Sequence, residues 1–431
     1  MTDRLPSTTL AIFGVSGDLS RRYLLPALDE ICKNSEARAN LSILGLSRRQ
    51  LNAEEVLPPQ AKDLASQFEV LQIDYQQPDE YLKLQAKLKS IGSEQVIFYF
   101  AVPPSAVLPI VGHLGTAGLN TPMYRLLMEK PFGTDLTSAE KLIDEISQNF
   151  KEEQVYRIDH YLAKEMAQNI TVFLGSNALL KGVWSNQFIE RIEIVAEESI
   201  GVEGRENFYE GTGALRDFVQ SHMLQLVALT LMQAPEDVFD FEQLPQKRLE
   251  VLRQLRLKSG TAIKAQYEGY RALVGNPSSQ IETFASLTLE SDDPRWRDVP
   301  IHLATGKKMA RKLTEIRVYF KKSHDSQANL LRLRVQPKEG IEFELWVKKP
   351  GYEDDLQMLP LDFSYQQHFD RLPDAYEQVI FDAMRSRANL FASSGEVLAS
   401  WRIIQPLLEK WSDIPLKIYK PGSHIKDIEN T

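Results

Sequence analysis

Cysteine is almost absent from this sequence. One cysteine, Cys32, stands among 431 residues, so neither an internal disulfide nor a cysteine-based metal site is expected. No apolar run approaches the about 20 residues that a membrane-spanning helix needs, and the first ten residues contain no signal-like apolar stretch. We therefore expect a cytoplasmic protein with no membrane partner and no metal, in which Cys32 is buried in a helix.

An excess of positive charge is also missing. The chain carries a net charge of −9 and has no basic tail, which argues against a general nucleic-acid partner. A hydrophobic content of 43% and a charged content of 25% are typical of a globular protein, and the length indicates two domains. In an acidic chain, any local cluster of basic residues becomes a candidate anion site.

The first third of the sequence alternates short apolar strands with amphipathic helices. This alternation predicts an α/β domain with a parallel, Rossmann-like, doubly wound sheet, which we place at residues 1–155. The expected strands are 9–13, 41–46, 68–75, 95–102 and 124–130, and the clearest expected helices are 81–91 and 138–150.

The rest of the chain alternates apolar and polar residues with a period of two. That period is typical of strands with one buried face, so we expect an α+β domain at 156–431 with a large, mainly antiparallel sheet. The expected strands are 189–198, 281–290, 314–322, 328–337 and 341–349, and the expected helices are 214–232, 373–386 and 394–411.

The first strand is followed by GVSGDLSRR at 14–22, in which Gly14 and Gly17 bracket a tight turn into a helix. Such a turn can hold a phosphate at the helix N-terminus, although an ordinary strand-to-helix turn would read the same way. The second strand ends in SRR, with Arg48 and Arg49 where an acid would bind a ribose hydroxyl. We therefore expect NADP rather than NAD, unless the two arginines belong only to a solvated loop.

RIDHYLAKE at 157–165 places His160 and Lys164 four residues apart. On a helix these two side chains would lie on one face and, when both are charged, would repel each other by a few tenths of a kcal/mol. We expect a helix here and an anion held between the two cations.

Four segments together resemble the glucose-6-phosphate dehydrogenase family. They are GVSGDLSRR, MEKPFG at 128–133, RIDHYLAKE, which is similar to the family's active-site signature, and GVEGRENFYEGTGALRDFVQSHMLQ at 201–225. The resemblance runs from about residue 9 to about residue 420. It implies that the C1 hydroxyl of a sugar phosphate loses its proton to a histidine while hydride passes from C1 to NADP, which gives a lactone.

The resemblance implies that His222 is the base and that Asp159 orients it. From the sequence alone, His222 is better explained as a buried histidine with one satisfied hydrogen bond, and Asp159 could also be a helix N-cap. The implied substrate-binding residues are His160, Tyr161 and Lys164 for the phosphate, and Lys130, Glu198, Asp217, Lys307 and Lys312 for the rest of the sugar. The implied cofactor-binding residues are Gly14, Ser16, Gly17, Asp18, Leu19, Arg48, Tyr99 and Lys130.

The sequence departs from the family pattern at a few positions. Ala163 replaces a glycine, which a helical position should tolerate, and Tyr23 stands where the family has a basic residue. Ser221 replaces an asparagine before the predicted base, and Ala304 replaces an arginine.

We thus expect an NADP-dependent glucose-6-phosphate 1-dehydrogenase of the pentose phosphate pathway. By resemblance, the exposed face of the large sheet should pair two copies, giving a homodimer or a dimer of dimers. One alternative is a related enzyme for another hexose phosphate or an unphosphorylated sugar. Another is a catalytically silent protein that binds NADP.

Overall fold

The structure is a computed structural model that describes residues 4–322 and 328–430, in two compact units. The first unit is the described chain up to Ala163 together with Pro373–Leu398. The second is Lys164–Leu372 with the described chain from Ala399 onward. The units are therefore not the two continuous segments 1–155 and 156–431, because the chain returns to the first unit late.

The first unit is built on a parallel sheet, as expected. Within the described residues the sheet has seven strands in the order β16-β6-β5-β4-β1-β2-β3, and β16 is the antiparallel one at the edge. The other six have the strand order of a doubly wound dinucleotide-binding fold. Their bounds are β1 Thr8–Phe13, β2 Leu41–Ser47, β3 Phe68–Gln72, β4 Gln95–Phe100, β5 Tyr124–Met128, β6 Val155–Ile158 and β16 Phe391–Ala392.

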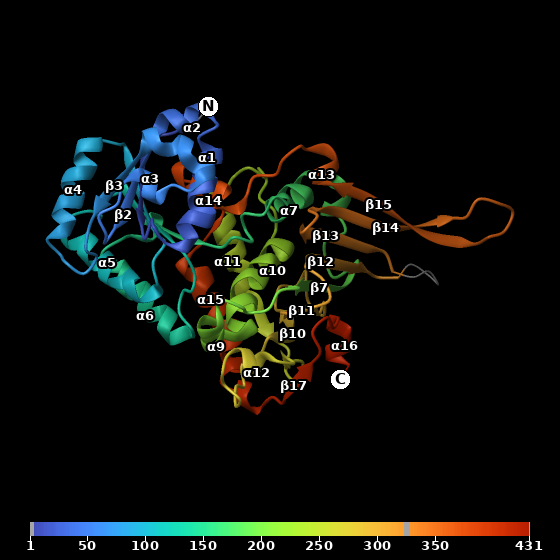
Figure 1. Cartoon of the computed structure of the whole chain (residues 1–431). Helices are drawn as coiled ribbons and strands as arrows, with labels where there is room; N and C mark the ends of the chain where they lie inside the picture. The colour runs from blue at the N-terminus through green and yellow to red at the C-terminus, as the bar shows by residue number, and fades with distance from the viewer. Residues whose placement is uncertain (1–3, 323–327, 431) are drawn as a thin grey trace. The chain divides into compact units, whose positions relative to one another are not determined.

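Helices cover both faces of this sheet, and strands such as β1 and β4 are therefore buried along their whole length. On one face lie α1 (Leu25–Ile31) and α14 (Ala375–Met384), and on the other lie α4 (Glu80–Ile91), α5 (Pro104–Thr116) and α6 (Leu136–Ser147) (Figure 1). Cys32 is buried in the core as expected, although it directly follows α1 and is not part of the helix. The remaining short elements are η1 Ser20–Leu24, α2 Ser35–Asn40, α3 Ala53–Val56, η2 Pro59–Gln67 and η3 Glu152–Gln154.

The second unit contains the large sheet, and it is mainly antiparallel as expected. Its described strands follow the order β15-β14-β13-β12-β7-β11-β10-β9-β17, with β8 paired to β10. The pairs β7–β11 and β9–β17 are parallel. The bounds are β7 Ile189–Glu197, β8 Leu255–Leu257, β9 Ile263–Tyr267, β10 Phe284–Ser291, β11 Ile301–Gly306, β12 Leu313–Phe320, β13 Leu330–Gln336, β14 Gly340–Lys348, β15 Leu356–Ser364 and β17 Leu416–Tyr419.

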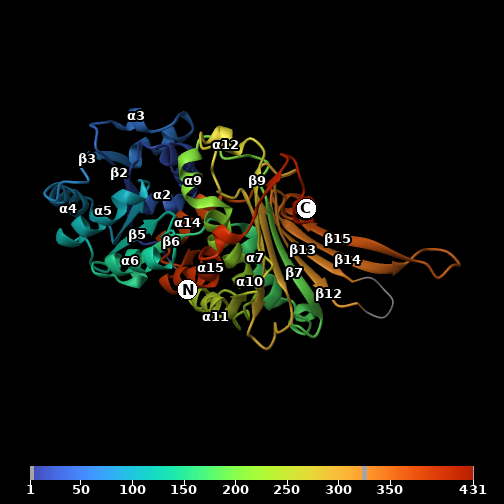
Figure 2. The same ribbon diagram turned by 90° about the horizontal axis from the view of Figure 1, so that it is seen from below.

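Helices pack on one face of this sheet, with α7 (Glu165–Ser176) against β13 and η4 (Leu215–Met223) against β10 and β11. Strands β14 and β15 form a hairpin that extends away from the rest of the sheet (Figure 2). Helix α15 (Ser394–Leu408) contains the division between the units at Leu398. The other elements are α8 Ala178–Lys181, α9 Glu206–Ala214, α10 Leu224–Leu231, α11 Leu244–Gln254, α12 Tyr270–Leu273, α13 Tyr365–His368, η5 Trp411–Asp413 and α16 Ile425–Glu429.

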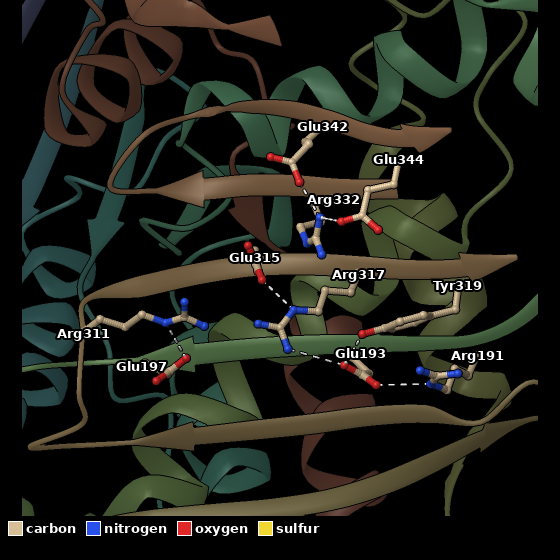
Figure 3. Close-up of polar contacts among 10 residues, drawn as sticks. All are labelled: Arg191, Glu193, Glu197, Arg311, Glu315, Arg317, Tyr319, Arg332, Glu342 and Glu344. Atoms are coloured by element: carbon tan, nitrogen blue, oxygen red, sulfur yellow. Dashed lines mark hydrogen bonds and ion pairs between the residues drawn. The ribbon is translucent and has the colours of Figure 1, made fainter. Parts of the chain in front are cut away.

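The other face of the large sheet carries ion pairs. Arg317 on β12 contacts Glu315 at 2.5 Å and Glu193 on β7 at 3.5 Å, and Arg332 on β13 pairs with two glutamates of β14 (Figure 3). The centre of this face is therefore a network of alternating charges. On β15 the strand register puts the exposed Leu356 and Met358 on this face, and Leu361, which is 63% exposed, on the opposite face.

RIDHYLAKE does not form the expected helix. The Asp159 carboxylate accepts the N–H of Tyr161 at 2.9 Å, and the Asp159 carbonyl accepts the N–H of Leu162 at 3.0 Å. Aspartate side chains that bond the backbone two residues ahead favour a turn over a helix. Helix α7 begins only at Glu165, so His160 and Lys164 do not share a helix face, and neither the helical position expected for Ala163 nor an N-cap at Asp159 is found.

In the described part of the chain, no helix combines the length and the apolar character needed to cross a bilayer.

Candidate active site

The turn after β1 brings the backbone very close to β4. Gly14 has a φ of +80°, and a Cβ placed on it would lie 2.2 Å from the carbonyl oxygen of Ala101. The Gly14 N–H donates to the Tyr75 hydroxyl at 2.9 Å, and the Gly17 N–H donates to the Gly14 carbonyl at 2.9 Å. Glycine is required at the first of these positions both for its conformation and for the lack of space.

A cavity of about 720 Å³ opens beside this turn, entirely within the first unit. It lies at the carboxyl ends of β1, β2 and β4, where doubly wound folds bind nucleotides. Arg48 and Arg49 are exposed on its edge. The lining residues are Gly14, Ser16, Gly17, Ser47, Arg48, Arg49, Tyr75, Gln76, Ala101, Val102, Pro103, Ser105, Ala106 and Pro109.

Four residues predicted to bind the cofactor do not line this cavity. Asp18 is exposed and pairs with Arg22 at 2.7 Å, while Leu19 packs against the apolar core under η1. Tyr99 is fully buried in β4, and its hydroxyl donates to Glu129 at 2.5 Å. Lys130 follows Glu129 directly after β5 and is half-buried.

Glu129 joins Tyr99 to His160. Its carboxylate lies 3.2 Å from Nε2 of His160, and the His160 ring packs against Tyr376 with centroids 4.3 Å apart. Burial opposes ionisation of Glu129, but His160, Tyr99 and Lys130 outweigh burial and lower the pKa of this carboxylate. The Nδ1 atom of His160 is buried and has no hydrogen-bond partner among the described residues. One nitrogen of His160 is therefore committed to Glu129, and the other remains available.

Asp159 and Tyr161 flank His160 in the same turn. The Asp159 side chain is 4% exposed and Tyr161 is 9% exposed. One carboxylate oxygen of Asp159 accepts the Tyr161 N–H within this turn.

In the second unit, Asp217 and His222 lie on one helical segment, η4. Its hydrogen bonds run from residue i to i+5, and such π-helical turns are rare and frequent at functional sites. Residues five apart, as Asp217 and His222 are, lie closer to one face here than they would on an α-helix. His222 is 5% exposed, and its ring meets Phe218 edge-on with centroids 5.2 Å apart.

Four polar residues gather beside η4. Lys307 forms an ion pair with Glu198, and its ammonium group lies 5.6 Å from the centre of the Tyr209 ring. Burial, followed by the charges of Asp217 and other acids, holds the pKa of Tyr209 far above its usual range. The structure thus brings three of the predicted sugar-binding residues, Glu198, Asp217 and Lys307, around one tyrosine.

Two predicted lysines lie outside this cluster. Lys164 occupies the N-cap position of α7 in an extended conformation and is half-buried. Its positive charge partly offsets the rise that burial causes in the pKa of Glu339. Lys312 is exposed just before β12.

The residues that depart from the family pattern each have definite surroundings in the structure. Tyr23 stacks on Tyr376 with centroids 5.4 Å apart, so a row of rings runs from Tyr23 through Tyr376 to His160. The Ser221 hydroxyl donates to the Asp217 carbonyl at 3.0 Å. Ala304 is fully buried in the apolar core of the second unit.

Sequence reasoning missed Glu129, Tyr209, Tyr75 and Tyr376. The signal for Glu129 was present, since an acid at the carboxyl end of a parallel strand lies where such folds place ligands. Nothing in the sequence places Tyr209 beside Lys307 or Tyr376 beside His160, because these contacts join segments about 100 and about 200 residues apart.

Comparison with known proteins identifies one family over nearly the whole chain. Residues 11–169 match the family model described as glucose-6-phosphate dehydrogenase, NAD binding domain, and residues 171–427 match the model of the C-terminal domain. A glucose-6-phosphate 1-dehydrogenase of Borreliella burgdorferi is 35% identical across 96% of this chain and 94% of its own length. One of Chlamydia muridarum is 33% identical across 95% of this chain and 91% of its own.

A solved structure is similarly close. It is described as glucose-6-phosphate dehydrogenase in complex with its substrate glucose-6-phosphate, and it superposes with a TM-score of 0.92. The sequence identity is 29%, and the match covers 98% of this chain and 96% of the other.

Proposed function

The chain belongs to the glucose-6-phosphate dehydrogenase family, and from that membership we infer that it oxidises glucose-6-phosphate to 6-phosphogluconolactone, the first step of the pentose phosphate pathway. The acceptor is a pyridine nucleotide. The observation that carries this inference is the full-length similarity to a dehydrogenase solved with glucose-6-phosphate. Steady-state turnover with glucose-6-phosphate, glucose and a second hexose phosphate tests it, and a preference for either of the other sugars would contradict it.

The residues around Gly14 fit a pyridine nucleotide. The missing side chain at Gly14 lets the turn lie against β4, and the cavity beside it has a volume of about 720 Å³. A bound nucleotide supplies the hydride acceptor. Gly14, Ser16 and Gly17 are proposed to lie against its phosphates at the start of the helix that follows the turn.

NADP is the proposed form of the nucleotide, with Arg48 pairing with the 2′-phosphate. The support is that two exposed arginines edge the cavity at the end of β2, where NAD-binding folds carry an acid. Arg48→Glu with Arg49→Glu should raise the KM for NADP at least about tenfold and leave that for NAD nearly unchanged. Arg38→Glu, an exposed change on α2 in the same unit, is the matched control. Equal losses for both nucleotides would contradict the assignment.

His222 is the proposed base. The C1–H bond breaks with its electron pair leaving as hydride, the C1 hydroxyl proton passes to His222, and a C1=O double bond forms. Burial of His222 against Phe218 favours a neutral imidazole, which is the form a base needs. Asp159 is the carboxylate assigned to orient it, and Glu198, Asp217, Lys307, Lys312 and Lys130 are assigned to the sugar.

His160, Lys164 and Tyr161 are proposed to bind the phosphate. The support from the structure is at His160, where Glu129 accepts from Nε2 and Nδ1 has no partner among the described residues. A cationic imidazole so held would present its Nδ1–H to a phosphate oxygen. His160→Ala should raise the KM for glucose-6-phosphate strongly and hardly change that for glucose. A parallel rise for both sugars would favour an enzyme for unphosphorylated sugars instead.

A homodimer, or a dimer of dimers, acting in the cytoplasm is proposed by the same family reasoning. The second unit supports pairing through its large sheet, since the apolar side chains of β15 are exposed.

A further inference from the structure

A second cavity, of about 780 Å³, lies wholly in the second unit. The end of α11, the segment through β8 and the second half of α15 form its walls. Its volume is within the about 300–1,000 Å³ that small-molecule sites usually occupy. None of the residues assigned to the substrate or the nucleotide lines it. The lining residues are Leu252, Arg253, Leu255, Arg256, Leu257, Lys258, Ser259, Gly260, Ala262, Ala399, Arg402, Ile403, Pro406, Leu407, Lys410, Asp413, Ile414 and Pro415.

The cavity combines an apolar floor with a basic rim. Its buried lining residues, such as Leu255, Ile403 and Leu407, are apolar. Its rim carries five cations and one acid, in a chain whose net charge is −9; they are Arg253, Arg256, Lys258, Arg402, Lys410 and Asp413.

The rim cations differ in what they already contact. Arg256 and Lys258 face Glu290, at 2.7 Å and 3.3 Å. Arg253 and Lys410 form no ion pair with any residue that the structure describes. An acidic chain that leaves two such cations at the mouth of an apolar cavity offers electrostatic complementarity to an anion.

We propose that this cavity binds a small amphipathic anion, whose apolar ring or chain lies on the floor and whose carboxylate, sulfonate or phosphate lies at Arg253 and Lys410. The apolar part supplies most of the contact area, and the charged part fixes the orientation.

Fluorescence titration with 8-anilinonaphthalene-1-sulfonate tests the site, with saturating NADP present to occupy the nucleotide cavity. Arg253→Glu with Lys410→Glu should weaken probe binding at least about tenfold. The matched control, Lys141→Glu with Lys338→Glu, changes charge equally at exposed positions that do not line the cavity and should bind as the wild type does. The uncharged analogue N-phenyl-1-naphthylamine should bind at least about tenfold more weakly to the wild type.

Three results would overturn the proposal. They are loss of the probe signal on adding NADP, unchanged binding in the Arg253–Lys410 double variant, and equal affinity for the charged and uncharged probes.

A second, independent observation concerns a buried carboxylate beneath η4. Glu282 is 1% exposed, and its Oε1 accepts the N–H of Leu215, the first residue of η4, at 2.9 Å. Its Oε2 accepts the indole N–H of Trp411 at 2.9 Å, and its carbonyl accepts the N–H of Ala214 at 3.1 Å. Glu282 therefore caps the start of this helix from another part of the chain.

The backbone at the start of η4 presses against this carboxylate. Gly213, with a φ of +68°, would place a Cβ 2.4 Å from Oε1 of Glu282. Burial raises the pKa of Glu282, and the bonds from Trp411 and Leu215 oppose that rise. Every polar atom of the carboxylate is thus committed, and the helix start cannot shift without breaking a buried bond.

The geometry points to Glu282 as a positioning residue that fixes η4, and through it Asp217 and His222, along the helix axis. This inference rests on the proposed role of His222 as the base.

Glu282→Gln and Trp411→Phe separate positioning from stability. A glutamine oxygen can accept from one donor, but its amide N–H would then face the other. We expect kcat about 100-fold lower in Glu282→Gln, the loss that a misplacement of about 1 Å can cause, with the nucleotide KM unchanged. Trp411→Phe keeps the Leu215 bond and should lower the melting temperature while leaving kcat within about threefold of wild type.

A lowered melting temperature with unchanged kcat in Glu282→Gln would show a purely structural role and overturn the inference. His222→Asn, assayed alongside, tells the two failures apart. If His222→Asn retains full turnover, the assignment of the base is wrong. If it abolishes turnover and Glu282→Gln does not, the positioning role alone is wrong.

Discussion

At the scale of single residues, the role proposed for His222 as the base depends on its burial and on its place in the helix. The His222 ring is buried against Phe218 and sits five residues after Asp217 on a π-helical turn. His222→Asn should lower kcat by about 10²–10⁴, the usual contribution of a general base, and leave nucleotide affinity unchanged. Stopped-flow turnover and nucleotide titration measure the two effects.

Ser221→Ala is the neighbouring control, because among the described residues the Ser221 hydroxyl bonds only the Asp217 carbonyl of its own helix. It should keep kcat within about threefold. A loss in Ser221→Ala as large as that in His222→Asn would point to damage of the helix rather than removal of a base.

Gly14 offers a second test at this scale. Gly14→Ala adds a methyl group 2.2 Å from the Ala101 carbonyl oxygen, at a φ of +80°. The turn has to move, so nucleotide affinity should fall at least about tenfold. A Cβ added at Gly112 in α5 would meet no other atom within 4 Å. Gly112→Ala should therefore raise the free energy of unfolding by about 0.5–1 kcal/mol. Calorimetric titration with NADP measures the affinity. Normal NADP binding by Gly14→Ala would contradict the assignment of this turn to the nucleotide.

At the scale of elements, α14 carries a buried acid that makes stability depend on pH. Burial raises the pKa of Asp382 from 3.8 to about 6, although Arg387, Asn389 and Arg385 oppose the rise. Between these two values the folded state holds a proton that the unfolded state has lost, so stability falls as pH rises through this window.

Asp382→Asn removes this penalty. The variant should be more stable than the wild type at pH 8, by on the order of 2 kcal/mol, and should gain little near pH 4. Urea denaturation at the two pH values measures the difference. An equal gain at both would mean that Asp382 is not the titrating group.

The ion pairs across the large sheet give another test at this scale. Arg317→Met leaves Glu315 and Glu193 without their shared cation in a half-buried position. We expect a loss of about 2–3 kcal/mol, somewhat below that for a fully buried pair. Arg256→Met removes a pair in which the arginine is 58% exposed and should cost at most about 1 kcal/mol. Equal losses in urea denaturation would show that the sheet pairs act as ordinary surface pairs.

The sequence predicted the strands of the first unit well, because a parallel strand buried on both faces is an apolar run whatever its neighbours are. Strands β2, β4 and β5 were found within a few residues of their bounds. The expected strands did not include β6, β8, β9, β11, β15, β16 and β17, most of which are short or exposed and lack a clean period of two.

The prediction of a helix from residue spacing was wrong where a side chain takes the place of a backbone hydrogen-bond acceptor. In RIDHYLAKE the spacing of His160 and Lys164 suited a helix, but the Asp159 carboxylate bonds the Tyr161 N–H and forms a turn. The candidate site was proposed through family resemblance. Its supporting residues Glu129 and Tyr209 depend on contacts that no spacing in the sequence encodes.

At the scale of the whole molecule, the outstanding expectation is pairing of two copies through the large sheet. Leu356 on β15 lies, by the strand register, on the face that carries the ion pairs and is 54% exposed, and Leu179 on α8 is 87% exposed outside that sheet. Leu356→Glu should convert a dimer to a monomer, whereas Leu179→Glu should not, because a charge in an apolar interface has to be desolvated. Sedimentation velocity at several concentrations decides this, and a monomeric wild type would end the proposal.

The late return of the chain to its first unit has a consequence for how the protein is made. Strand β16 completes the edge of the parallel sheet beside β6, and α14 covers one of its faces, yet both come from residues beyond 372. During synthesis on the ribosome, the nucleotide-binding sheet would have an open edge and a partly uncovered apolar face while the more than 200 intervening residues are made. Open edges and bare apolar faces invite aggregation, so a nascent chain of this kind is an expected client of chaperones.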